Sequence, residues 1–150
     1  DWEKNVSPYA DEIDVIYIVR DEELTYNPKN ETVGENILAK RYTVKQGSGH
    51  LAAVEEAFGS ITKVLRKIDA KIARRIYRNK FRNNGQFDFQ LVYPFKSWTR
   101  FEGSEALGLP KGFRADYEKS YGKGSFEKKV IKVLADHTFN RTQEVLTMVK

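Results

Sequence analysis

The sequence contains no cysteine, four prolines and two histidines, and no apolar run in it approaches the thickness of a bilayer. Without cysteine, the chain can form no disulfide, no thiolate nucleophile and no cysteine-ligated zinc or iron–sulfur site. A membrane-spanning helix needs about 20 consecutive apolar residues, and the sequence has no such stretch. The composition, with 40% hydrophobic residues and no low-complexity segment, predicts a soluble folded globule, for which we expect no metal and no cofactor.

The length of 150 residues fits one ordinary domain with a single core. We therefore expect a single domain over residues 1–150, with an acidic N-terminal arm over about residues 1–12. The first residue is Asp1 rather than Met, which fits either processing at the N-terminus or an artificial start of the sequence. The compartment stays open, because a chain without cysteine carries no redox signature.

The net charge of +5 is distributed unevenly along the chain. Residues 1–36 hold ten acidic and three basic side chains, a balance of −7. Residues 37–83 hold three acidic and twelve basic side chains, a balance of +9. Opposite charges on adjoining segments favour contact between them, either within one chain or between neighbouring copies.

Apolar residues recur at helical spacing from Leu51 to Ile76, in steps of three and four. This pattern predicts one long amphipathic helix over residues 51–83, closed by the Asn and Gly residues that follow. Phe58 and Leu65 belong to the heptad part of the stripe, which favours packing against the chain's own last helix.

Other segments complete the predicted fold. Residues 12–19 predict a buried strand, residues 86–95 alternate as a strand should, and residues 37–46 are a third candidate. A short helix is predicted from about residue 114 and a last helix over residues 125–149. We therefore expect an α+β domain in which one long basic amphipathic helix and a C-terminal helix pack with a small sheet of two or three strands.

The second half of the long predicted helix carries a basic face that is interrupted only by Asp69. A solvated helix face is one explanation of such a charge run. Exposed helices ordinarily interleave opposite charges, however, so a row of cations also fits a surface that meets an anionic partner. Tyr77 and Phe81 add two rings four residues apart, a mixture that suits bases and phosphates. The predicted binding residues are Lys63, Lys67, Lys71, Arg74, Arg75, Tyr77, Arg78, Phe81 and Arg82.

Three classes of partner fit this basic face. An acidic protein surface, including the acidic arm of a neighbouring copy, would make the chain a non-catalytic subunit of a larger assembly. Nucleic acid is the alternative, favoured by the arginines and rings but opposed by the acidic residues 1–36. The third, an anionic membrane surface, is disfavoured because the predicted helix needs its apolar face for the core. We predict the assembly subunit.

An enzymatic function is the third and weakest interpretation. Trp98, Glu102 and Glu105 lie in an aromatic-rich segment, residues 96–113, that could line a pocket. Aromatic side chains that cover the core explain the same segment without a ligand. The sequence therefore favours a non-enzymatic function.

Two further patterns carry little weight. Residues 47–52 match the G-x-G-x-x-A dinucleotide pattern, but the preceding segment is too polar for a buried parallel strand, which favours a plain turn into a helix. His50 and His137 have no neighbour in sequence that would complete a catalytic triad or a metal site. We therefore predict no catalytic residue and no metal ligand.

Overall fold

The computed structural model describes residues 16–29, 34–81, 86–101 and 108–147. The strands are β1 (Ile18–Arg20), β2 (Asn36–Val44), β3 (Arg75–Asn79), β4 (Phe89–Phe95) and β5 (Thr138–Thr147). The helical elements are α2 (His50–Lys67), the 3-10 helix η2 (Trp98–Phe101), α3 (Phe113–Tyr121), the π-helical turn η4 (Glu127–Ile131) and α4 (Lys132–His137).

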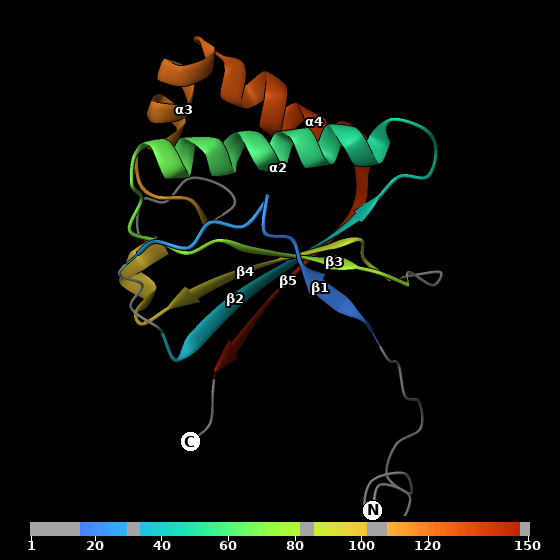
Figure 1. Cartoon of the computed structure of the whole chain (residues 1–150), viewed down its shortest axis with the longest axis horizontal. Helices are drawn as coiled ribbons and strands as arrows, with labels where there is room; N and C mark the ends of the chain where they lie inside the picture. The colour runs from blue at the N-terminus through green and yellow to red at the C-terminus, as the bar shows by residue number, and fades with distance from the viewer. Residues whose placement is uncertain (1–15, 30–33, 82–85, 102–107, 148–150) are drawn as a thin grey trace, which may run out of the picture.

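The strands form one antiparallel sheet in the order β1-β3-β4-β2-β5. Helices α2, α3 and α4 all lie on one face of this sheet (Figure 1). From β2 onward, the chain follows the β-α-β-β-α-β order of ferredoxin-like domains, and β1 is added at the edge beside β3. The predicted sheet of two or three strands was wrong, because the described residues alone contribute five.

The predicted helix over residues 51–83 was wrong in its second half. α2 ends at Lys67, Asp69 adopts a left-handed φ of 45°, and the chain then returns as β3. A step of four residues, as from Ile72 to Ile76, keeps two side chains on one face of a helix, but also on one face of a strand. In β3, which pairs with β4, Ile76 is completely buried, and this burial favours the strand over the helix.

The predicted last helix over residues 125–149 was wrong in the same way. Helical structure ends at His137, and β5 then runs antiparallel to β2. Val145, which falls within the predicted helix, lies opposite Leu38 in the sheet. Nine residue pairs join β5 to β2, with an irregularity between Thr43 and Val44. This pairing satisfies the backbone groups of β5 within the sheet.

The remaining predicted elements have mixed outcomes. The strand over residues 12–19 was expected to be buried, but β1 covers three residues at the sheet edge, and the described side chains before and within it are exposed. Residues 12–15 lie outside the described part. The strands predicted over residues 37–46 and 86–95 are confirmed as β2 and β4, and the short helix as α3.

α2 packs on the last helix where both are helical, as predicted. Phe58 and Leu65 of α2 share one buried core with Val130 and Leu134 and with the inward side chains of the sheet. Leu51, expected in this core, is exposed at the start of α2. The core therefore fixes the inner face of α2 and leaves its outer face between two neighbouring segments.

Candidate functional site: a groove over helix α2

The nine predicted binding residues do not form one surface. Lys63 and Lys67 are exposed on α2, and Lys71 is exposed in the turn that follows it. Phe81 is exposed beyond the end of β3, and Arg82 lies outside the described residues. A single basic helix face is therefore absent from the fold.

The other four predicted residues are divided between the two faces of the sheet. Arg74 and Arg78 alternate with the same period as the buried Ile76 and so point toward the helices. Arg75 and Tyr77 point to the opposite face. The mixture of cations and rings on which the nucleic-acid alternative depended is split by this change from helix to strand.

Arg74 is completely buried and cannot meet a partner at the surface. Its Nη1 donates to Thr62 Oγ1 at 3.1 Å and to the Phe58 carbonyl at 3.4 Å, and its Nε donates to the Tyr93 hydroxyl at 3.4 Å. The guanidinium carbon also lies 5.2 Å from the centre of the Phe58 ring. Within the described part of the chain, Nη2 has no hydrogen-bond partner and no carboxylate balances the charge.

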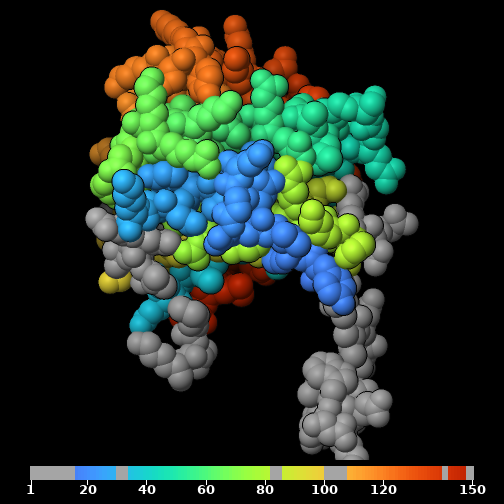
Figure 2. Space-filling view, viewed as in Figure 1, coloured from blue at the N-terminus to red at the C-terminus, as the bar shows by residue number. Residues whose placement is uncertain are grey.

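A groove of about 720 Å³ runs over the outer face of α2. Small residues of the helix, Ala53, Ala57, Gly59 and Ser60, form its floor, and their size is the reason for the depression. One side is bounded by the turn after β1 and the other by η4 and the neighbouring ends of α3 and α4. Figure 2 shows α2 (green) between the segment that includes β1 (blue) and the C-terminal helices (orange).

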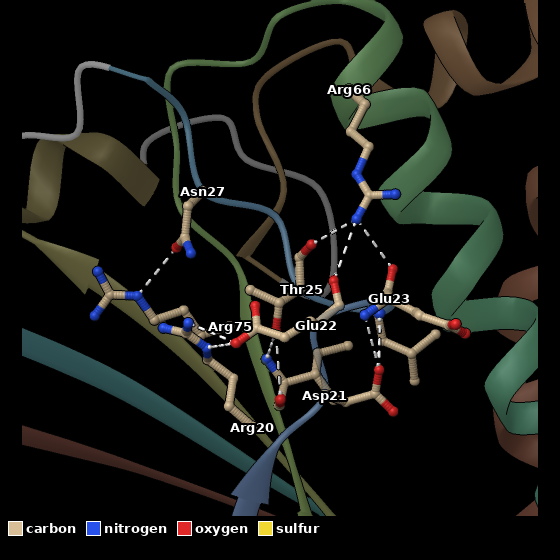
Figure 3. A network of polar contacts seen from close by, with 10 residues as sticks. Arg20, Asp21, Glu22, Glu23, Thr25, Asn27, Arg66 and Arg75 are labelled. Carbon is tan, nitrogen blue, oxygen red and sulfur yellow. Dashed lines mark hydrogen bonds and ion pairs between the residues drawn. The ribbon is translucent and has the colours of Figure 1, made fainter.

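The turn after β1 is held against α2 by Arg66. From Nη2, this side chain donates to three backbone carbonyl oxygens of the turn, those of Glu22, Glu23 and Thr25, at distances of 3.1–3.4 Å (Figure 3). These carbonyls have no partner within a strand at this point, so the guanidinium satisfies them. Arg66 therefore builds one wall of the groove through its Nη2.

Arg78 of β3 fixes the same wall from below, because it forms ion pairs with both Asp21 and Glu55. Burial tends to raise the pKa of Asp21, but hydrogen bonds from the Leu24 amide and from Arg78 outweigh this effect and hold the pKa below its usual value. The Asp21 carboxylate therefore stays ionised beside the arginine. Like Arg66, Arg78 is engaged within the protein.

The opposite wall supplies cations that are less engaged. Lys129 Nζ lies 5.3 Å from the centre of the Tyr121 ring, which is cation–π geometry. Lys63 enters the groove from α2 and Lys128 from η4, and neither forms an ion pair with any described residue. Five basic and three acidic side chains line the groove, a balance of +2.

The lysines at positions 128 and 129 were missed by the sequence prediction, which confined the site to residues 63–82. A signal for them was present: the pair Lys128 and Lys129 belongs to the helix that was expected to pack against residues 51–83. Packing of these two helices places Lys128 and Lys129 in the same groove as Lys63.

The two histidines have no sequence neighbours that could serve as partners but meet each other in the fold. Nδ1 of His50, at the start of α2, lies 2.8 Å from Nδ1 of His137, at the end of α4. The described residues contain no group of three or more His, Asp or Glu side chains that could hold a metal ion. The contact therefore joins two helix ends and supplies no catalytic dyad with a carboxylate.

The glycine pattern before α2 has no nucleotide-binding context. Gly49 is the N-cap of the helix and has a left-handed φ of 86°, a conformation that glycine adopts without steric cost. β2, which precedes it, is antiparallel to both of its neighbours, whereas the dinucleotide motif needs a parallel β-α-β unit. Among the described helices, none has the length and apolar composition to cross a bilayer.

Comparisons with protein-family models, with curated proteins and with solved structures each gave no match. The order of strands and helices does not supply a function either, because one arrangement of strands and helices can serve many unrelated functions. The residues that line the groove are therefore the basis for a proposed function.

Proposed function

We propose that this protein is a non-catalytic binding subunit whose α2 groove receives an acidic segment of a partner protein. The observation that carries the proposal is the presence of Lys63 and Lys128 in the groove without ion-pair partners among the described residues. A carboxylate placed between them would accept charge-assisted hydrogen bonds and balance the excess positive charge.

The groove fits an acidic peptide better than a nucleic acid. Glu23 and Glu56 also line it and would repel a continuous phosphate backbone, whereas a peptide can place its few carboxylates away from them. The Tyr121 ring is already covered by Lys129, and Tyr77 is on the other face of the sheet, so stacking of bases has no support here. Apolar side chains of a peptide can instead contact the small residues of the floor.

A fluorescence anisotropy titration tests the proposal with two labelled acidic peptides, one with the sequence of residues 1–12 and one rich in glutamate. We expect Lys63→Glu/Lys128→Glu to weaken binding by at least about tenfold, because two attractive contacts become repulsive. The matched control is Lys111→Glu/Lys123→Glu, which makes the same charge change at exposed lysines outside the groove. The control should bind within about twofold of the wild type after correction for ionic strength.

Three results would contradict the proposal. Equal weakening in both double variants would mean that the peptides respond to net charge and not to the groove. Absence of binding to either peptide at low salt would remove the acidic partner. Tighter binding of a single-stranded oligonucleotide than of both peptides would favour the nucleic-acid alternative.

A further inference from the structure

The edge of the sheet at β1 is apolar, and among the described residues no strand covers its outer side. Four consecutive side chains, Ile16, Tyr17, Ile18 and Val19, have exposed fractions of 38–62%. β1 is the terminal strand of the sheet order, and its described neighbour is β3 alone. Proteins usually protect such edges with charged residues or proline, because an exposed apolar edge pairs readily with another strand.

The hydrogen bonds of β1 show which backbone groups are directed outward. The Tyr17 carbonyl accepts from the Lys80 amide at 2.9 Å, and the Asp21 amide donates to the Ile76 carbonyl at 2.8 Å. Inward-directed residues alternate with outward-directed ones along an antiparallel strand. The amide and carbonyl groups of Ile18 therefore point away from β3.

We propose that two copies of this chain associate through antiparallel pairing of their β1 strands, with the two-fold axis at Ile18. In this register, the outward residue Ile18 faces its own equivalent, and Ile16 faces Arg20 of the second copy. About six backbone hydrogen bonds then join the two sheets into one. Tyr17, on the other side of the strand, lies beside Val19 of the second copy.

A second copy fits this edge because β1 is complementary to itself. Tyr17 stacks edge-on with Phe81 at 5.9 Å between ring centres, and Phe81 is 71% exposed. In the two-fold arrangement, this pair of rings covers Val19 of the second copy, and the same contact repeats on the other side of the axis. The opposite edge, β5, is less suited, because the middle of that strand is the polar sequence of residues 142–144.

Sedimentation velocity over a range of concentrations tests the proposal. We expect a concentration-dependent dimer for the wild type, and at least about a tenfold weaker dimer for Ile18→Lys. The matched control is Leu146→Lys, which places the same charge on a similarly exposed apolar residue at the β5 edge and should leave the dimer unchanged. A second variant, Ile18→Pro, removes an outward amide without breaking a bond to β3 and should also favour the monomer.

Each further outcome is decisive. The dimer should persist at high salt, because its contacts are apolar and between backbones; a dimer lost in salt would contradict the proposal. A wild type that stays monomeric at about 100 µM, or Ile18 variants that dimerise as the wild type does, would overturn it. Circular dichroism confirms that the variants fold. Because Ile18 is not among the residues that line the groove, peptide binding should survive in these variants, so this proposal and the proposed function fail separately.

Discussion

Residues 50–67 and residues 70–79 share the apolar spacing of a helix, yet the first segment is α2 and the second contains β3. Pairing separates the two segments, because β3 forms ladders with both β1 and β4, and composition adds only a weak local difference. The helical segment contains Ala and Glu, which favour helices, whereas the sequence of β3, Arg-Ile-Tyr-Arg-Asn, contains residue types that favour strands. Apolar spacing alone therefore does not separate two structures whose periods both accept a step of four.

The same two segments use their cations differently. The exposed lysine of the helical segment that reaches the groove, Lys63, has no ion pair with a described residue. In the strand segment, Arg78 pairs with two carboxylates, Arg75 donates to Asn27 Oδ1 at 3.1 Å, and Arg74 is buried. The cations of this continuous basic segment therefore have two roles. Some are exposed and can bind a partner, whereas others are buried or form contacts within the fold.

Replacing Ile76 and Ile68 by alanine in turn gives the largest expected contrast between the two segments. A continuous helix would place these two residues on one apolar stripe, but Ile76 is 0% exposed in β3 and Ile68 is 36% exposed at the end of α2. We expect Ile76→Ala to lower the free energy of unfolding by about 2–5 kcal/mol and Ile68→Ala by less than about 1 kcal/mol. Chemical denaturation measures both. Similar losses for the two variants would support the continuous helix.

The strands β2 and β4 and the first part of each long helix could be predicted from the sequence, because local pattern and final environment agree there. Phe58 and Leu65 are examples, since helical spacing and burial coincide. β3 and β5 could not, because their strand form depends on partners distant in sequence: β5 pairs with β2, about 100 residues earlier. The position of Val145 was fixed by that pairing.

The candidate site was predictable in part. Lys63 was identified because an unpaired cation on a helix is visible in sequence. The burial of Arg74 was not, because strand alternation sets its direction and helical alternation would have placed it at the surface. The depression itself depends on the small residues of α2 lying between two walls, and one wall comes from a turn held by Arg66, which no pattern in the sequence indicates.

Replacement of Arg74 and Arg78, the two inward arginines of the strand segment, should change the free energy of unfolding by an intermediate amount. Arg78→Met leaves Asp21 and Glu55 without their partner and should cost about 1–3 kcal/mol at neutral pH. Arg74→Met removes a buried cation that no described carboxylate balances, so the free energy of unfolding should stay the same or rise. Denaturation at neutral pH measures both changes. A larger loss for Arg74→Met than for Arg78→Met would show that an anion balances Arg74.

Denaturation at low pH provides a control for the comparison of wild type with Arg78→Met. The pKa of Asp21 is lowered in the folded state, so its contribution to stability is present above the unfolded value of about 3.9 and is lost as the pH falls. The difference between wild type and Arg78→Met should therefore shrink when denaturation is repeated near pH 3. A difference that is independent of pH would mean that Arg78 stabilises the protein through packing on Phe89 and not through its carboxylates.

The smallest expected effect lies at Asp69, at the junction of the two segments. Here the order of two melting temperatures is the test. Asp69 has a φ of 45°, a conformation that glycine adopts without steric cost and that alanine does not. Both Asp69→Gly and Asp69→Ala remove the exposed ion pair with Lys71, so the comparison between them isolates the backbone. If the chain turns here, the glycine variant should have the higher melting temperature, even though glycine loses more entropy on folding. In a helix that continued to residue 83, alanine would be the more stable of the two, because glycine is among the poorest residues in a helix interior. Calorimetric melting of the two variants therefore decides whether one helix or a helix and a strand follow residue 50, by the order of two temperatures and without reference to the wild type.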